Sequence, residues 1–166
     1  MIEIRPFEPA RDAGSLARLV AEHDVHYGGS QPDLDDVERR LMALPPGVEI
    51  LLAVDDRPQQ QPVGFASFSI LFPTSGAMPL LYLKELYVTA ASRRRGGARM
   101  LLQSLARIAH ERGCTRLEWT TSQENAAARA LYDALGAEPM PWKISYRIDG
   151  EALNRMAGRR GQRQPQ

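Results

Sequence analysis

The sequence is poor in cysteine, in net charge and in long apolar runs. Cys114 is the single cysteine among 166 residues, so an intramolecular disulfide framework is excluded and a reducing compartment suits the chain. Basic and acidic residues number 21 and 20, which leaves a net charge of +1 and no overall field to attract nucleic acid. No apolar run approaches the ~20 residues that span a bilayer, and the N-terminal segment lacks the apolar region of a signal peptide. We therefore expect a cytoplasmic protein that binds neither membranes nor nucleic acid.

The sequence is instead rich in short apolar strands and amphipathic helices. Its apolar periodicity predicts strands over 2–6, 48–54, 62–72, 80–88, 115–121 and 142–148. It predicts helices over 9–24, 32–44, 96–112 and 125–137, with a short helix within 149–157. Adjacent strands followed by a βαβ crossover indicate an α/β fold with a mixed sheet and helices on both faces. We expect one domain over 2–157 and a disordered tail over 158–166.

Arginine and glycine are concentrated where the predicted strand 80–88 gives way to a helix. The residues there are Arg93, Arg94, Arg95, Gly96, Gly97, Ala98 and Arg99. A helix N-terminus offers unpaired N–H groups and the positive end of a dipole, and glycine lets a ligand approach the backbone closely. This combination indicates an anion site suited to phosphate; a solvated basic turn is the alternative reading. The G-x-x-x-x-G-K-[ST] pattern and the dinucleotide-binding fingerprint are both absent.

The same turn carries a resemblance to a known family. The run from Arg93 to Ala98 fits the signature [QR]-x-x-G-x-[GA] of the GNAT superfamily of N-acetyltransferases. The strand LYLKELYV before the turn and the pattern N-x-x-A-x-x-L-Y-x-x-L-G-A from Asn125 to Ala137 resemble the same family. The resemblance covers about residues 2–157 and, within the family, is nearest to the diamine (spermidine/spermine-type) branch.

The resemblance implies acetyl-coenzyme A (acetyl-CoA) as cosubstrate and no metal. The turn backbone would hold the pyrophosphate, and strand 80–88 would pair with the pantetheine arm. The sheet must then splay beside this strand, which in the family commonly carries a β-bulge. Arg94 and Ala98 stand where many members have glycine, although Arg94 still supplies its N–H. The implied coenzyme-binding residues are Leu86, Tyr87, Val88, Arg93, Arg94, Arg95, Gly96, Gly97, Ala98, Arg99, Asn125 and Arg129.

Acetyl transfer to an amine needs a neutral amine, a stabilised oxyanion and a proton for the leaving thiolate. The resemblance implies that Tyr132 is the acid that protonates the thiolate, although a tyrosine beside a leucine stripe is otherwise a core residue. Glu85 is the first candidate for holding or deprotonating the amine, ahead of Glu118 and Glu124; a salt-bridged strand residue is the alternative. Asn125 also has a structural reading, as the N-cap of its helix.

The remaining reactive side chains carry weaker signals. Cys114 follows Gly113 at a helix end and is read as a small buried residue, because the family transfers the acetyl group directly. His23, His26 and His110 show no metal-ligand spacing. His26 and Tyr27 are expected to line the acceptor pocket, since the corresponding loop does so in the family.

The acceptor is predicted to be the primary amine of a small molecule. The diamine branch has two adjacent acids in the strand where this chain has Lys84 and Glu85, so Lys84 would favour a zwitterion over a polyamine if a bulge turned it toward the pocket. A peptide or protein acetyltransferase and a non-catalytic CoA sensor are the rival readings. Relatives of this branch are mostly homodimers, and we expect a dimer formed partly through 142–148.

Overall fold

A computed structural model describes residues 1–56, 61–72 and 75–158 of the chain. These residues form two compact units, the first ending at Glu124 and the second beginning at Asn125, and each unit is described by itself. The boundary lies within the segment 2–157, for which the expectation of a single domain stays a prediction. The predicted tail falls almost entirely on 159–166, outside the described residues.

The first unit is built on a five-stranded sheet. Its strands are β1 (Ile2–Pro6), β2 (Glu49–Asp55), β3 (Pro62–Leu71), β4 (Leu80–Val88) and β5 (Leu117–Glu118). Its helices are α1 (Pro9–His26), α2 (Leu34–Leu41) and α3 (Gly97–Glu111), with single 3₁₀ turns η1 (Ser75–Ala77) and η2 (Ala90–Ser92). Proline at the first position starts α1, and the Asp33 side chain caps α2 by accepting from the N–H groups of Asp35 and Asp36.

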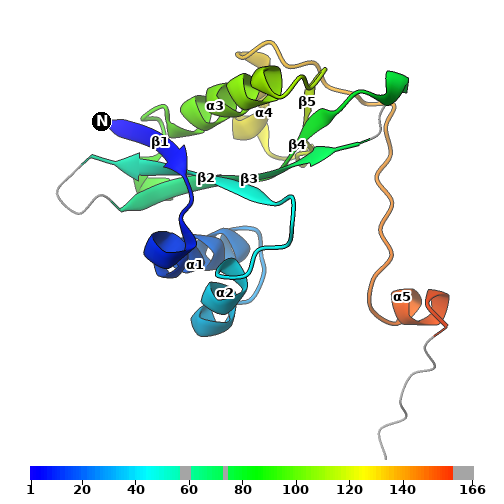
Figure 1. Cartoon of the computed structure of the whole chain (residues 1–166), viewed down its shortest axis with the longest axis horizontal. Helices are drawn as coiled ribbons and strands as arrows, with labels where there is room; N and C mark the ends of the chain where they lie inside the picture. The colour runs from blue at the N-terminus through cyan, green and yellow to red at the C-terminus, as the bar shows by residue number, and fades with distance from the viewer. Residues whose placement is uncertain (57–60, 73–74, 159–166) are drawn as a thin grey trace, which may run out of the picture. The chain divides into compact units, whose positions relative to one another are not determined.

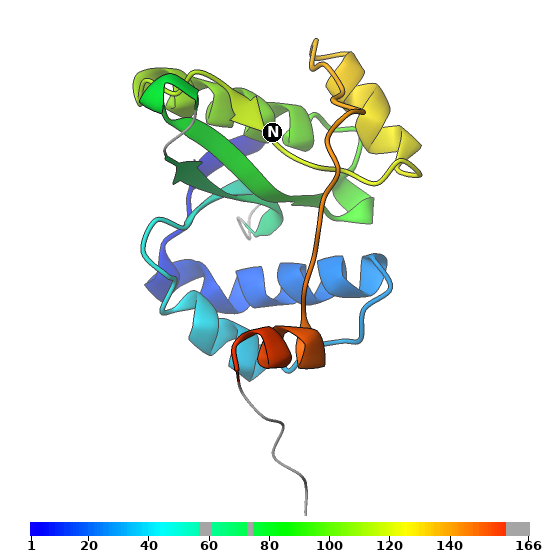
Figure 2. The same ribbon diagram turned by 90° about the vertical axis from the view of Figure 1, so that its right-hand side faces the viewer.

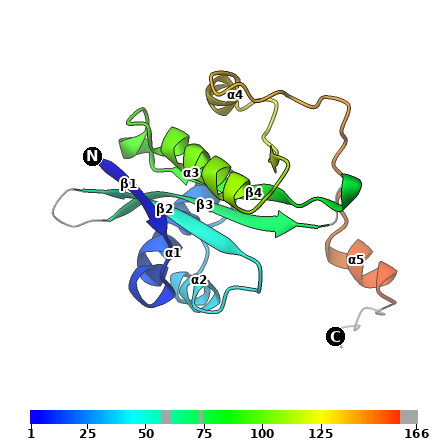
Figure 3. The ribbon, with the colours of Figure 1, turned by 45° about the horizontal axis from the view of Figure 1, so that its top comes forward.

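The strands lie in the order β1-β2-β3-β4-β5 (Figure 3). β1 to β4 are antiparallel neighbours, and β5 runs parallel to β4 after the crossover through α3. Helices α1 and α2 cover one face of the sheet and α3 covers the other (Figures 1 and 2). The predicted mixed sheet with helices on both faces is therefore confirmed.

Apolar side chains fill both helix–sheet interfaces. Leu16 of α1 and Leu52 of β2 are fully buried on one face, where Phe65 and Tyr87 join the same cluster. Leu101 and Leu105 of α3 are equally inaccessible to solvent. Each such side chain contributes about 1.5–3 kcal/mol by burial, so the core fixes α1 and α3 firmly against the sheet that carries the site.

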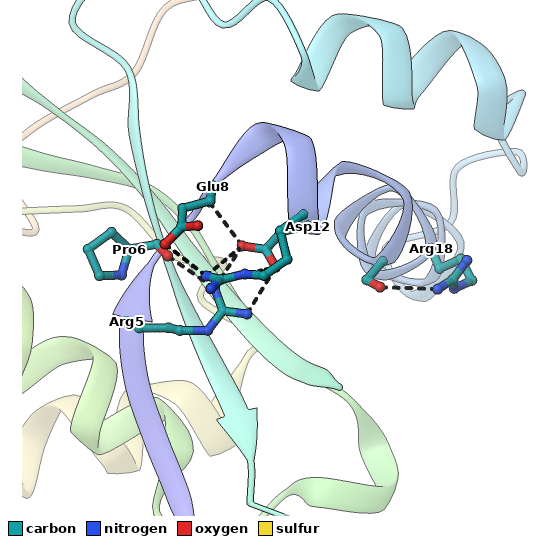
Figure 4. Close-up of polar contacts among 7 residues, drawn as sticks. Arg5, Pro6, Glu8, Asp12 and Arg18 are labelled. Carbon is teal, nitrogen blue, oxygen red and sulfur yellow. Dashed lines mark hydrogen bonds and ion pairs between the residues drawn. The ribbon is translucent and has the colours of Figure 1, made fainter. Parts of the chain in front are cut away.

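A buried ion pair fixes the start of α1 (Figure 4). The Asp12 carboxylate is 3% exposed and accepts hydrogen bonds from Arg5 at 2.7 and 2.9 Å and from the backbone N–H of Glu8 at 2.9 Å. Burial alone would raise the pKa of Asp12, but hydrogen bonds from Arg5 and Arg11 outweigh it and hold that pKa well below its usual range. The pair thus ties β1 to the first turn of α1.

The second unit contains α4 (Ala126–Asp133) and α5 (Gly150–Met156). The Asn125 side chain accepts from the N–H of Ala128 at 3.1 Å, so the predicted N-cap is confirmed. Beyond α4, Gly136 has a φ of 77°, as the predicted helix end requires.

The sequence-based strands at the end of the chain need correction. The prediction of a strand over 142–148 is wrong: the segment pairs with no strand among the described residues, and Trp142, Ile144 and Tyr146 are 73%, 74% and 92% exposed. Alternating apolar residues specify which side chains share a face, but a strand also needs a hydrogen-bonded neighbour. The strand expected over 115–121 is reduced to the two residues of β5 for a related reason, because β4 pairs with it only there.

Two findings apply to the described ranges alone. No helix in them combines the length and apolarity of a membrane span. No group of three or more His, Cys, Asp or Glu side chains in them is arranged to hold a metal ion.

Candidate active site

The turn between β4 and α3 has the backbone geometry of an anion site. Arg94 and Gly96 both adopt left-handed φ angles, 62° and 87°, and Gly96 is the N-cap of α3. Left-handed residues in a turn gather N–H groups into anion-binding concavities, and the first turn of a helix adds N–H groups that have no helical acceptor. A Cβ placed on Gly96 would meet no atom within 4 Å, so this side of the turn is open to a ligand. The backbone therefore suits a phosphate group.

Two of the arginines in the turn are held by protein partners. Arg95 donates to both carboxylate oxygens of Asp55, at 2.6 and 3.3 Å. Arg93 donates from Nε to the carbonyl of Val88 at 3.2 Å, and its Nη2 lies 3.2 Å from Nε2 of His26. Arg94 and Arg99 are exposed. Sequence reasoning did not identify Asp55, because its contact with Arg95 joins residues 40 positions apart.

The sheet opens between β4 and β5. The two strands pair only at Leu81 with Leu117 and at Tyr82 with Glu118, although β4 continues to Val88. On its β5 side, β4 has no strand partner from 83 to 88 among the described residues. The predicted splay is thus present, and within the described ranges it leaves Leu86, Tyr87 and Val88, next to the turn, without a strand partner on the β5 side.

A β-bulge at Lys84 lies in the middle of β4. Ser67 pairs with Glu85 and the next residue of β3, Phe68, pairs with Leu83, so Lys84 is the extra residue. Residues paired across strands share a face, and Glu85 therefore lies on the opposite face from Leu83. Lys84 Nζ is 2.7 Å from Glu85 Oε1. The lysine ammonium at the bulge thus contacts the Glu85 carboxylate, and the orientation of Lys84 toward an acceptor pocket stays a prediction.

Glu85 meets a histidine that sequence reasoning left unassigned. Nε2 of His23, in the last turn of α1, lies 3.2 Å from Glu85 Oε2, and Nδ1 lies 3.1 Å from Asp24 Oδ1. The hydrogen bond with Glu85 raises the pKa of His23, and the hydrogen bond with His23 in turn lowers the pKa of Glu85. Only the fold brings these residues together, because 62 positions separate them in the chain.

Aromatic side chains surround this pair. The His23 ring centroid lies 4.9 Å from that of Tyr27, 5.6 Å from Tyr87 and 6.0 Å from Phe65. His26 packs against Tyr27 and Tyr87 and so belongs to the same aromatic cluster, while the acceptor pocket expected at His26 and Tyr27 stays a prediction. The Tyr87 hydroxyl donates to Glu22 Oε1 at 2.8 Å; burial, with help from Glu22, raises the pKa of Tyr87 to about 12. Through its contact with Arg93, His26 also joins the cluster to the turn.

The other predicted site residues belong to the second unit or lie on parts of the first unit outside the turn and the His23–Glu85 pair. Tyr132 is half-buried on α4, Asn125 caps that helix, and Arg129 is exposed on it. Glu118 lies on β5, where it contacts Arg116 and pairs with Tyr82 of β4. Cys114 is a half-buried free thiol just after α3. Within the first unit, the site therefore combines an N–H-rich turn, an open strand edge and the carboxylate of Glu85.

The chain is similar to known acetyltransferases. The model of the acetyltransferase (GNAT) family matches residues 16–137. A thialysine N-epsilon-acetyltransferase of Caenorhabditis elegans is 33% identical over 102 residues, which are 59% of this chain and 62% of that protein. The match therefore spans about three fifths of that relative's length.

Solved structures resemble nearly the whole chain. An integron cassette protein from the mobile metagenome of V. cholerae is 28% identical, with a TM-score of 0.85 over 94% of this chain and 97% of that one. The aminoglycoside acetyltransferase AAC(6')-Iy, in complex with the bisubstrate analogue CoA-S-monomethyl-acetylneamine, is 25% identical, with a TM-score of 0.70 over 90% of this chain and 99% of that one.

The fold and the matched segment define the class. The chain belongs to the acetyltransferase (GNAT) family. The TM-scores of 0.85 and 0.70 show that these structural relatives share its fold.

Proposed function

We propose that this protein is an acetyl-CoA-dependent N-acetyltransferase that transfers an acetyl group directly to the primary amine of a small molecule. The observation that carries the proposal is the open edge of β4, which runs from the carboxylate of Glu85 to a turn rich in free N–H groups. A thioester chain lying along this edge would have its phosphates at the turn and its reactive end near Glu85.

The residues present fit the coenzyme. Backbone groups of Leu86, Tyr87 and Val88 would pair with its pantetheine arm, as an added strand would. The turn from Arg93 to Arg99 would hold the pyrophosphate through its N–H groups and the positive end of α3. When bound, the coenzyme supplies the activated acetyl group. Arg93 and Arg95 form hydrogen bonds within the protein, which supports a role in shaping the turn. Arg94 and Arg99 are exposed and able to neutralise phosphate charge.

Glu85 and Tyr132 are the proposed catalytic residues. Glu85 would hold the acceptor ammonium and help to remove its proton. Tyr132 would donate its phenolic proton to the departing thiolate, because a thiolate is a better leaving group when it is protonated as it departs. Asn125 and Arg129 are proposed coenzyme contacts from the second unit. The family match over 16–137 crosses the boundary between the units, which supports one domain over 2–157.

A zwitterionic amine, such as an amino acid with a side-chain amine, is the proposed acceptor. Lys84 stands beside Glu85, so the site offers both a cation and a carboxylate to the substrate. Thialysine, which the curated relative's name gives as its substrate, carries both an amine and an α-carboxylate. Both observations favour this class of acceptor over a polyamine.

A thiol-release assay tests the proposal. The protein is given acetyl-CoA and a panel of amino acids, polyamines, aminoglycosides and peptides, and free thiol is measured over time. We expect release with at least one small amine. Release with peptides alone would make the protein a peptide acetyltransferase, and calorimetric binding of CoA without turnover on any amine would make it a sensor.

A pair of variants at Gly96 tests the coenzyme site. Gly96→Asp places a carboxylate on the open side of the turn, whereas Gly96→Asn has nearly the same shape, tolerates a positive φ and carries no charge. We expect Gly96→Asp to abolish CoA binding in calorimetry and Gly96→Asn to weaken it modestly. Equal affinities for the two variants would place the phosphate elsewhere.

We further propose a cytoplasmic homodimer. The segment 142–148 supports this, because Trp142, Ile144 and Tyr146 recur at every second residue and are exposed. Such a segment buries its apolar side chains when it pairs with another strand, and a second copy would supply one. Light scattering after gel filtration should report a dimer, and Ile144→Glu should shift it toward the monomer. A monomeric wild-type protein at micromolar concentration would refute the dimer.

A further inference from the structure

His23 is a titratable group in the aromatic cluster beside Glu85, and no step of the proposed reaction uses it. Its side chain is only 14% exposed, and aromatic rings from α1, β3 and β4 surround it. A polar ring buried to this extent needs partners for both nitrogens. It has them, in the carboxylates of Glu85 and Asp24.

The contacts fit a protonated ring. A neutral imidazole has one N–H donor and one acceptor nitrogen, whereas both ring nitrogens of His23 face carboxylate oxygens, which only accept. The charged and titratable groups around His23 are Glu22, Asp24 and His26 on α1, Tyr27 just after it, Lys84, Glu85 and Tyr87 on β4, and Arg93 after η2. The carboxylates nearest to His23 favour its charged form.

The charge on His23 competes with the acceptor. Glu85 already has Lys84 at one oxygen and His23 at the other, at 2.7 and 3.2 Å. An acceptor ammonium arriving at Glu85 would be a third cation at one carboxylate, and like charges at this range repel. Loss of the proton from His23 removes one of the competing cations and leaves Glu85 a stronger partner for the amine.

We propose that His23 is a positioning residue that orients Glu85 and, by its charge, sets how strongly Glu85 holds a cationic acceptor. The inference rests on the proposed role of Glu85 in the acceptor site. Two consequences separate it from a purely structural role: acceptor KM depends on the protonation of His23, and a neutral residue that still donates to Glu85 removes this dependence.

The test compares wild type with His23→Gln and His23→Phe, using one acceptor and acetyl-CoA at saturation from pH 5.5 to 9. His23→Gln can still donate to Glu85 but does not titrate. Its acceptor KM should be about three- to tenfold below that of wild type at the acid end, and equal to it at the alkaline end. His23→Phe keeps the aromatic packing but loses the donor, so its kcat should fall at every pH. Comparing variants at the same pH cancels titration of the amine itself.

Two controls separate the possible failures. Glu85→Gln should raise acceptor KM while CoA affinity in calorimetry stays unchanged; an unaltered KM would overturn the proposed role of Glu85 itself. If Glu85→Gln behaves as expected but the ratio of KM values for wild type and His23→Gln is constant with pH, the inference about His23 is wrong. Imidazole proton shifts in NMR, assigned with His26→Gln and His110→Gln, should show His23 titrating over the pH range in which the KM ratio changes.

Discussion

Arg95 points its guanidinium at the buried carboxylate of Asp55, at the end of β2, and the two groups share hydrogen bonds of 2.6 and 3.3 Å. The Asp55 side chain is 5% exposed and that of Arg95 is 36% exposed. This contact ties the turn before α3 to the end of β2, two strands away from β4 in the sheet. One of the three consecutive arginines, Arg95, therefore forms an ion pair within the protein.

Arg95→Ala should damage the turn more than Arg94→Ala does. Truncating Arg95 leaves the Asp55 carboxylate buried without this partner, and we expect the Kd for CoA to rise about tenfold or more. Arg94→Ala removes only an exposed charge and should raise it about threefold or less. Calorimetry measures both, and a larger effect at Arg94 would contradict the anchoring role. In the double variant Arg95→Ala/Asp55→Ala, part of the affinity should return.

Lys84→Glu should shift the acceptor preference toward polyamines. A charge pair at about 4 Å and an effective dielectric near 20 is worth up to about 4 kcal/mol before desolvation, and solvent screening of this exposed lysine reduces that figure. We therefore expect the ratio of kcat/KM for spermidine to that for a diamino acid to rise about tenfold. Lys143→Glu makes the same charge change in the second unit and serves as the comparison for a general effect of net charge. A wild-type preference for spermidine would refute the role of Lys84.

Tyr132→Phe should lower kcat with little change in the Kd for CoA. A positioned acid contributes on the order of 10²- to 10⁴-fold to the rate. Tyr146→Phe is a matched control, because Tyr146 is 92% exposed in the same unit. Stopped-assay thiol release gives kcat for both variants. If the two retain wild-type rates across the pH range, Tyr132 is a core residue.

Asp12→Asn should destabilise the protein in a pH-dependent manner. Breaking a buried ion pair costs about 3 kcal/mol or more, and urea unfolding at pH 7 should show this loss. Because the pKa of Asp12 is lowered in the folded state, its stabilisation is present above the ordinary carboxyl pKa and is lost as pH falls below it. The difference from wild type should therefore shrink between pH 5 and 3. Asp36→Asn, on the surface of α2, should change stability little at either pH.

Local patterns in the sequence were sufficient for much of the fold. The bounds of β4 and the glycine cap of α3 follow from an apolar run and from the left-handed φ that Gly96 adopts. The bulge at Lys84 was expected only by resemblance, because no single residue type marks an inserted strand position.

Long-range contacts in the site were beyond such patterns. The sequence around His23 shows only an amphipathic helix. The contact of His23 with Glu85 depends on how α1 packs over β4. Asp55 directly follows the predicted strand 48–54, and no local pattern marks its contact with Arg95. The wrong strand over 142–148 has the same origin, since alternation in a sequence carries no information about whether a hydrogen-bonding neighbour exists.

The bulge at Lys84 also divides β4 into two registers. Leu83 and Glu85 are two residues apart, yet they face opposite layers of helices, because one extra residue stands between them. Because Ser67 and Phe68 are consecutive residues of β3, a strand that lacked Lys84 would still place Leu83 and Glu85 on opposite faces. Straightening the bulge with Lys84 kept in the strand would instead turn Glu85 and Tyr87 away from α1, toward the side occupied by α3. The orientation of Glu85 therefore depends on the bulge being formed, whereas the register does not fix which side chain stands at position 84.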